Sequence, residues 1–181
     1  MSMQVLHGRN SGTLQCTDHS VTFTGTKNQM STWQSNLNTI VDVLYTSTEH
    51  FIICFIQKNK EDTINTENVQ FHKQKIGNCS NFIEELKRGV NVTKIKPYGI
   101  TGAIKNNSIQ LSHTNSYFII IYGTKVDPIP WDKIDVLVVE RENPYSLTTD
   151  LVIVFKDLHK EVLLIKSIEN IKIGIVQKWF E

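Results

Sequence analysis

The sequence is poor in the features that mark membrane, secreted and strongly nucleic-acid-binding proteins. Its longest apolar run, residues 117–122, is far shorter than the roughly 20 residues that a transmembrane helix needs. Its 3 cysteines are widely spaced and odd in number, which argues against a disulfide framework and favours a reducing compartment. Lys plus Arg number 19 and Asp plus Glu number 18, so no overall charge draws the chain onto nucleic acid or an anionic membrane. Any charged partner must therefore be met by a local patch.

The usual signatures of enzyme active sites are also missing. Gly99 and Gly102 have part of the spacing of a phosphate-binding loop, but the third glycine and the lysine are absent. No Gly-x-Ser-x-Gly nucleophile elbow occurs. Cys16 and His19 have a ligand-like spacing, yet a zinc site needs about four ligands and no second suitable pair follows. The sequence thus predicts no catalytic residues, no cofactor and no metal.

What the sequence does contain is a repeat at the end of each half. From Leu151, two apolar runs separated by a charged turn lead into one short amphipathic helix. A fainter copy lies upstream, where the runs 51–57 and 69–72 lead to a helical segment at 81–88. Because each half ends strand, strand, helix, the pattern indicates a duplication. We therefore predict a mainly β protein of two modules, residues 1–91 and 92–181, each closed by a C-terminal helix.

Short alternating runs bounded by turn-forming residues predict antiparallel strands in both modules. The expected strands are 12–16, 20–24, 30–35, 39–45, 51–57 and 69–72, and then 101–105, 108–112, 117–122, 134–139, 151–156 and 162–165. Proline lacks the amide donor that a central strand needs. We therefore expect Pro128, Pro130 and Pro144 in the loops between strands.

Each predicted helix has a recognisable start or apolar face. Asn81, with Glu84 three residues later, is expected to cap the first helix. In the second helix the apolar stripe is expected to run along one face: Ile171, Ile175, Val176, Trp179 and Phe180. A glycine inside this helix, Gly174, costs about 1 kcal/mol relative to alanine, so packing of the stripe must hold the helix in place.

Three groups of residues resemble a known family. The first half has Gly12-Thr13-Leu14, then Val21-Thr22-Phe23, and later Glu67-Asn68-Val69-Gln70-Phe71. The second half opens with Tyr98-Gly99-Ile100-Thr101-Gly102-Ala103, followed by Ile109-Gln110-Leu111. The most specific group is Ile134-Asp135-Val136 with Glu140-Arg141, then 150–157 ending in Phe155-Lys156-Asp157, then Ile171 and Val176 to Trp179. In this order the residues are similar to the middle domain of the large subunit of the FACT histone chaperone complex.

The resemblance implies two tandem pleckstrin-homology-like modules of β-barrel or β-sandwich type. The chain departs from the family pattern in two places. The helical segment within 76–89 is minimal, and no further helical segment or acidic tail follows residue 181. We therefore expect an excised domain of a larger protein, whose other domains would hold the small subunit of the complex.

The function implied by the resemblance is histone binding without catalysis. The chain is expected to engage the central histone tetramer during nucleosome disassembly and reassembly, in transcription, DNA replication and DNA repair, on the chromosome in the nucleus. The histone-binding candidates are charged residues near strand ends of the second module: Glu140, Arg141, Glu142, Lys156, Asp157, Lys160 and Glu161. Three lysines near the junction are candidates for contact with nucleosomal DNA or acidic histone positions: Lys94, Lys96 and Lys105.

Two alternatives remain open at this point. The first is a scaffold that docks a replication or transcription partner through one sheet face. The second is a phosphoinositide adaptor, because some pleckstrin-type modules hold a headgroup with basic residues on the first hairpin. Taken as residues 15–20, that hairpin has no basic residue in the first module, and its counterpart in the second has Lys105 alone. A multiply charged phosphate would lack counter-charge there, so membrane binding is the less favoured reading.

Overall fold

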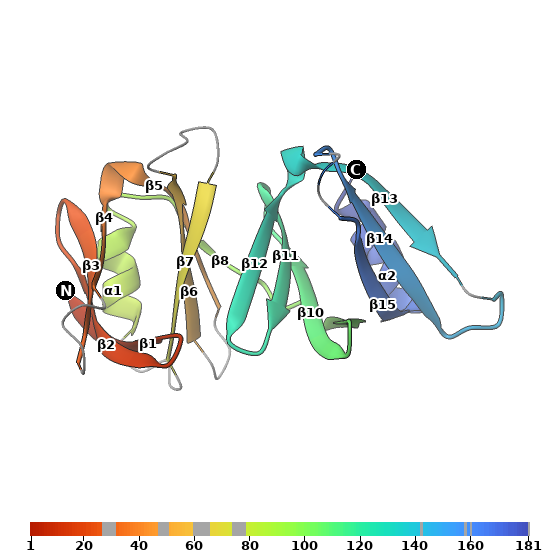
Figure 1. Ribbon diagram of the computed structural model, residues 1–181, viewed down its shortest axis with the longest axis horizontal. Coiled ribbons are helices and arrows are strands. Elements are labelled where there is room, and N and C mark those ends of the chain that lie inside the picture. The colour runs from red at the N-terminus through yellow and green to blue at the C-terminus, as the bar shows by residue number, and fades with distance from the viewer. Residues whose placement is uncertain are drawn as a thin grey trace. The chain divides into compact units, whose positions relative to one another are not determined.

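The computed structural model describes residues 1–26, 32–46, 51–59, 66–73, 79–141, 143–157, 159 and 161–180. It divides into two compact units, Met1–Ile95 and Lys96–Glu181. Within the described residues, each unit is a mainly antiparallel β-structure with one α-helix near its C-terminal end (Figure 1). The prediction of a mainly β protein with two such modules is confirmed.

The first unit contains an eight-stranded sheet and one helix. The strands are β1 (Ser2–His7), β2 (Asn10–Cys16), β3 (Ser20–Gly25), β4 (Thr32–Asn36), β5 (Ile40–Tyr45), β6 (Phe51–Lys58), β7 (Thr66–Lys73) and β8 (Val92–Lys94). A 3-10 turn, η1 (Leu37–Thr39), joins β4 to β5, and helix α1 (Cys79–Leu86) precedes β8. The strand order is β4-β3-β2-β1-β7-β6-β5-β8.

The second unit contains a seven-stranded sheet and one helix. The strands are β9 (Ile100–Ile104), β10 (Asn107–His113), β11 (Tyr117–Tyr122), β12 (Lys125–Pro130), β13 (Ile134–Glu140), β14 (Thr148–Phe155) and β15 (Leu163–Glu169). The 3-10 turn η2 (Trp131–Lys133) joins β12 to β13, and helix α2 (Asn170–Lys178) follows β15. The strand order is β12-β11-β10-β9-β15-β14-β13.

The two units repeat one topology down to its irregularities. In each, the fourth strand ends in a 3-10 turn that leads directly into the fifth strand. The fifth strand then has a register shift at its start, between Ile40 and Asp42 in β5 and between Ile134 and Val136 in β13. Such a bulge places one unpaired residue in the strand and strengthens its twist. The repeat therefore extends well beyond the strand, strand, helix endings from which it was inferred.

Each unit has its own core, made by the inward-facing residues of its strands and by its helix. In the first unit, Phe23, Phe55 and Phe71 are fully buried and pack ring against ring, with centroids 5.1 Å apart for Phe23 and Phe71. Gly12 makes room for this packing, because a Cβ atom there would lie 2.5 Å from the ring of Phe23. In the second unit, Ile153 is fully buried in the equivalent core.

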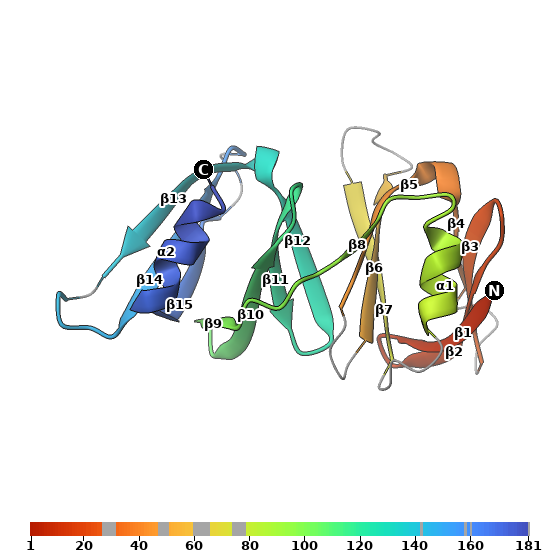
Figure 2. The same ribbon diagram turned by 180° about the vertical axis from the view of Figure 1, so that it is seen from behind.

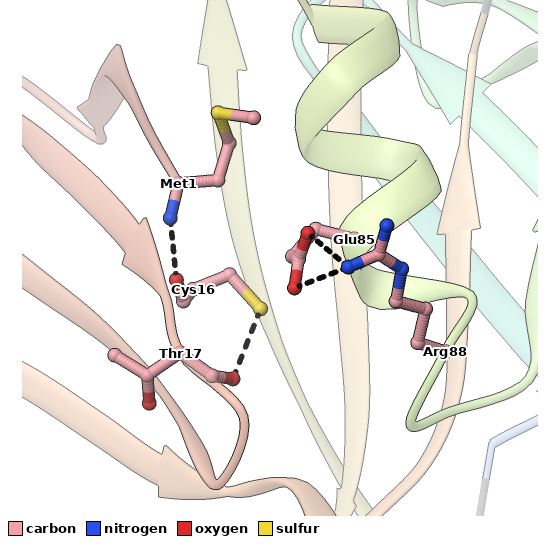
Figure 3. A network of polar contacts seen from close by, with 5 residues as sticks. All are labelled: Met1, Cys16, Thr17, Glu85 and Arg88. Carbon is pink, nitrogen blue, oxygen red and sulfur yellow. Dashed lines mark hydrogen bonds and ion pairs between the residues drawn. The ribbon is translucent and has the colours of Figure 1, made fainter.

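The N-terminus completes the first sheet beside the end of α1. The Met1 ammonium group donates to the Cys16 carbonyl over 2.8 Å, and the Cys16 thiol donates to the Thr17 carbonyl (Figure 3). Glu85 and Arg88 form an ion pair of 3.1 Å at the end of α1. Burial raises the pKa of the Cys16 thiol above its ordinary value. Cys16 is therefore a core residue, and its thiol is a weak nucleophile.

Three strands were not predicted, and two of them have clear reasons. Strand β1 reads Ser-Met-Gln-Val-Leu-His, in which only Met3 and Val5 are fully buried, so its apolar signal is weak. Strand β12 contains Pro128 and Pro130, which were expected in loops and lie instead in an edge strand. Proline is tolerated there because its missing donor faces away from the one neighbouring strand.

The third missed strand, β8, moves the boundary between the units. Val92, Thr93 and Lys94 pair in parallel with β5, so these residues belong to the first unit. The predicted division lay after residue 91, whereas the first unit ends at Ile95. Three residues are enough to add a strand because β5 offers a free edge at that point.

Both helix predictions need correction. Helix α1 begins at Cys79, so Asn81 lies inside its first turn and is not the cap. In α2 the buried residues are Ile173 and Val176, while Ile171 is 84% exposed and Ile175 is also exposed. Figure 2 shows α2 lying over β14 and β15, with which it is in contact. Phe180, which follows α2, is exposed as well, so the predicted stripe was wrong at three of its positions.

Candidate protein-interaction surface

The described residues contain no cluster suited to metal binding. Within those ranges, no group of three or more His, Cys, Asp or Glu side chains converges on one point. Helices there are too short and too polar to span a bilayer. Two of the shifted pKa values follow mainly from burial. Burial raises the pKa of the Cys79 thiol. The pKa of Tyr122 is raised to about 12, first by burial and then by the negative charge of Asp127, whose carboxylate accepts a hydrogen bond from the Tyr122 hydroxyl. What the structure offers for recognition is its exposed surface.

The predicted histone-binding residues lie at two opposite ends of one sheet. Glu140 ends β13 and Arg141 follows it, and Glu140 pairs with Asp150 near the start of β14. Lys156 and Asp157 follow the other end of β14. Lys156 follows Asp150 by six positions along an extended chain, which at about 3.3 Å per residue separates the two by roughly 20 Å. The expected single cluster therefore does not form.

The remaining members of that set follow the same division. Glu161 is exposed just before β15, at the Lys156 end of the sheet. There the Asp157 carboxylate accepts the backbone N–H of His159 over 3.0 Å, which orders the turn. Glu142 and Lys160 lie outside the described residues.

The three junction lysines are exposed, and the two that belong to the second unit lie far apart. Lys94 ends β8 in the first unit, whereas Lys96 and Lys105 belong to the second. The Lys96 carbonyl accepts the hydroxyl of Ser112 at one end of β10, over 2.7 Å. Lys105 lies in the β9–β10 turn at the other end, with a positive φ of 50°. The two lysines of the second unit are thus separated by most of the length of β10.

Three strongly exposed apolar residues, which were not predicted, lie at the Glu140 end of the sheet. Tyr145 and Leu147, in the turn between β13 and β14, are 93% and 85% exposed. Ile171, in the first turn of α2, is 84% exposed. The Leu147 carbonyl accepts the backbone N–H of Asn170 over 3.1 Å, which holds Leu147 next to the start of α2. We call Tyr145, Leu147 and Ile171 the turn–helix patch.

The turn–helix patch is held in place by a polar network centred on Asn170. The Asn170 side-chain amide donates to the Ser146 carbonyl, and its oxygen accepts the hydroxyl of the buried Thr149. Asn143 also accepts the backbone N–H of Tyr145 over 3.0 Å. Large apolar side chains that remain exposed on an ordered turn are typical of a contact surface. In the sequence, the signal for this surface was limited to Tyr145 and Leu147, two apolar residues in a mostly polar loop.

The first hairpin of unit one also differs from its predicted position. It is the β1–β2 turn, with Gly8 at a φ of +61° and Arg9 exposed, and not residues 15–20. The side chain of His7 is hydrogen-bonded to the Gln70 carbonyl over 2.8 Å. A phosphoinositide headgroup at this turn would meet the charge of Arg9, whereas lipid-binding modules of this type provide several basic residues.

These features define a class of protein by fold. In both units seven strands follow one antiparallel order, with the fourth and fifth strands at its two ends and a helix after the seventh; in the first unit β8 then adds beyond β5. The chain is a tandem pair of pleckstrin-homology-like modules.

Comparisons with known proteins show low similarity to a solved structure. No protein-family model matches the sequence, and no curated protein matches it. Among solved structures, the Spt16D Pob3N heterodimer is similar with a TM-score of 0.46 and 8% sequence identity. The match covers 86% of this chain and 82% of that chain. Similarity at this level assigns neither a family nor a function.

Proposed function

We propose that this chain is a histone-binding module of a FACT-type chaperone and that it engages the central histone tetramer. Two lines of support combine. The residues that resemble the FACT middle domain most specifically fall on β13, β14 and α2 of the second unit. The tandem pleckstrin-homology-like fold is the one that the resemblance implies. In this proposal the protein acts on the chromosome in the nucleus, during transcription, replication and repair.

The observation that carries the proposal is the turn–helix patch beside Glu140 and Arg141. Histones stripped of DNA expose basic side chains together with apolar surface, so a chaperone needs carboxylates and apolar anchors in one place. Tyr145, Leu147 and Ile171 provide the apolar anchors, and Glu140 provides a carboxylate. Buried anchors of this kind each contribute about 1–2 kcal/mol or more at protein interfaces.

The proposed mechanism is mass action, without nucleotide hydrolysis. A module that binds exposed histone surface lowers the free energy of the state in which DNA has been removed, by an amount set by its concentration relative to Kd. The same interaction shields the apolar and basic surface that would otherwise aggregate. Glu140 and Lys156 lie at opposite ends of the sheet. We propose the Glu140 end as the primary histone contact, because the turn–helix patch lies there.

A binding panel at physiological salt tests this proposal. The purified chain is titrated with the central histone tetramer, the outer histone dimer, naked DNA and phosphoinositide vesicles. We expect saturable binding to the tetramer, weakened at least tenfold by the double change Leu147→Ser and Ile171→Ser, a loss of about 1.4 kcal/mol or more. The matched control is Val41→Ser, which changes an exposed valine in the first unit and leaves binding unchanged. Binding to vesicles alone, or an equal effect of the control, contradicts the proposal.

A further inference from the structure

The two units differ at the edge formed by the fifth strand, which is paired with an added strand in the first unit alone among the described residues. In the first unit the outer edge of β5 is covered by β8, which adds in parallel. The Val43 N–H donates to the Asn91 carbonyl over 2.8 Å, and the Ile95 N–H donates to the Tyr45 carbonyl over 2.8 Å. The Asn91 side chain also donates to the Asp42 carboxylate. One short extended segment thus satisfies the backbone groups of this edge.

The equivalent edge of the second unit is β13. Both strands begin after a 3-10 turn and have the register shift at the same point, so Ile134 corresponds to Ile40 and Val136 to Asp42. By this alignment Leu137 and Val139 occupy the positions of Val43 and Tyr45, whose backbone groups bond to the added segment. Among the residues that the structure describes, β13 pairs with β14 and with no strand on its other side.

The free edge of β13 also lacks most of the features that protect edge strands. Natural edges are commonly blocked by proline, lysine or a bulge. The opposite edge strand, β12, contains Pro128 and Pro130, whereas β13 has neither proline nor lysine along its length. Its bulge is confined to the first residues, and beyond it Val136 and Val138 are 47% and 40% exposed. The strand is therefore suited to pairing with another segment.

The charges at this edge favour a basic partner. Glu140 lies directly opposite Asp150 across β13 and β14, so two carboxylates share one face of the sheet. Like charges directly opposite each other destabilise a sheet unless a cation lies between or beside them. The Asp150 carboxylate accepts the Ser167 N–H over 2.9 Å, which holds it in place. The strand itself has two acidic residues, Asp135 and Glu140, and no basic one.

We propose that the edge of β13 binds an extended, lysine-bearing segment of a partner protein, which adds as a parallel strand in the way that β8 adds to β5. The segment alternates β-branched or apolar residues, which pack beside Val136 and Val138. Its lysine lies near Glu140 and Asp150. This binding mode does not depend on the partner being a histone.

The chain supplies its own probe for this edge. A synthetic peptide of residues 90–96, Val-Asn-Val-Thr-Lys-Ile-Lys, has the sequence that already forms such a strand on β5, and the probe carries the change Ile95→Lys. In the same register on β13, its Thr93 lies opposite Val138 and the lysine introduced at position 95 lies opposite Glu140, on the sheet face that Glu140 shares with Asp150. The blocked peptide is titrated into the isotope-labelled full chain and followed by the backbone amide signals.

We expect saturable shifts concentrated in β13, with slowed amide exchange at Leu137 and Val139. A matched peptide methylated at the amide nitrogen of residue 95 cannot donate to the edge, and we expect it to bind at least tenfold more weakly. Glu140→Lys should weaken the unmodified peptide about fivefold, which corresponds to about 1 kcal/mol for one exposed ion pair. Asp18→Lys, the same charge change in an exposed turn of the first unit, should leave the peptide affinity unchanged.

Three results would overturn the inference. The methylated peptide binding as tightly as the unmodified one would show that no strand is added. Shifts centred outside β13, or no binding up to millimolar peptide, would place the partner elsewhere. A concentration-dependent dimer through β13 in the absence of peptide would show that a second copy of the chain is the occupant.

Discussion

Replacing either of two isoleucines in α2 with alanine tests how this helix closes the second unit. Ile173 is 8% exposed and belongs to the core, whereas Ile171 is 84% exposed on the same helix. Truncation of a buried isoleucine to alanine typically costs 2–5 kcal/mol, from lost burial and from the cavity that remains. Because α2 is a single short helix on an open sheet and can partly relax, we expect about 2–3 kcal/mol for Ile173→Ala. Ile171→Ala should stay within about 0.5 kcal/mol of zero.

Thermal unfolding of the full chain, followed by tryptophan fluorescence, measures the difference. A domain of 60–100 residues loses about 4–8 °C in Tm for each kcal/mol, so Ile173→Ala should lower the transition of the second unit by roughly 10–20 °C. The Ile171→Ala variant has the same chemistry on the same helix and serves as the control. Equal Tm losses for the two variants, or a larger loss for Ile171→Ala, would refute the burial described for α2.

Four further predictions concern individual residues. Gly102→Ala should destabilise the chain by about 1–3 kcal/mol in urea unfolding, because its Cβ would lie 2.9 Å from a methyl group on β15. Gly174→Ala, which meets no atom within 4 Å, should instead stabilise it by up to about 1 kcal/mol, and a loss there would contradict the helix environment. Burial lowers the pKa of His113 in the folded chain below its ordinary value of 6.5. As the pH drops below about 6.5, the unfolded chain takes up a proton at this histidine before the folded chain does, so the free energy of unfolding should fall. A His113→Gln variant with the same slope between pH 6.5 and 5 would exclude this histidine as the cause. Cys16 and Cys79, whose thiol pKa values are raised by burial, should react with iodoacetamide far more slowly than free cysteine, and fast labelling of the native chain would contradict their burial.

The strands that were predicted correctly are those in which alternation and burial agree. In β14 the inward residues Leu151, Ile153 and Phe155 are buried and alternate with partly exposed ones, so the pattern is visible in the sequence. In β1 and β12 it is not, because β1 has few apolar residues and β12 has two prolines. Pairing with β2 and β7 on its two sides makes β1 possible, and edge position makes β12 possible; both are properties of the topology.

The face of α2 and the candidate surface depended on tertiary structure in the same way. Period alone allowed either Ile171 or Ile173 to face the sheet, and the packing of α2 on β14 and β15 selected Ile173. The charged residues near Glu140 and Lys156 were placed together from their nearness to strand ends. The antiparallel register puts them at opposite ends of β14, and no local pattern contains that information.

Hydrogen–deuterium exchange of the chain with and without the central histone tetramer is the most direct test of the proposed function. The account predicts slower exchange in 140–148 and in the first turn of α2, with little change at the Lys156 end of the sheet. Adding the outer histone dimer at the same concentration should leave these segments unaffected. Unchanged exchange throughout the chain at saturating tetramer, or protection confined to the Lys156 end, would contradict the account.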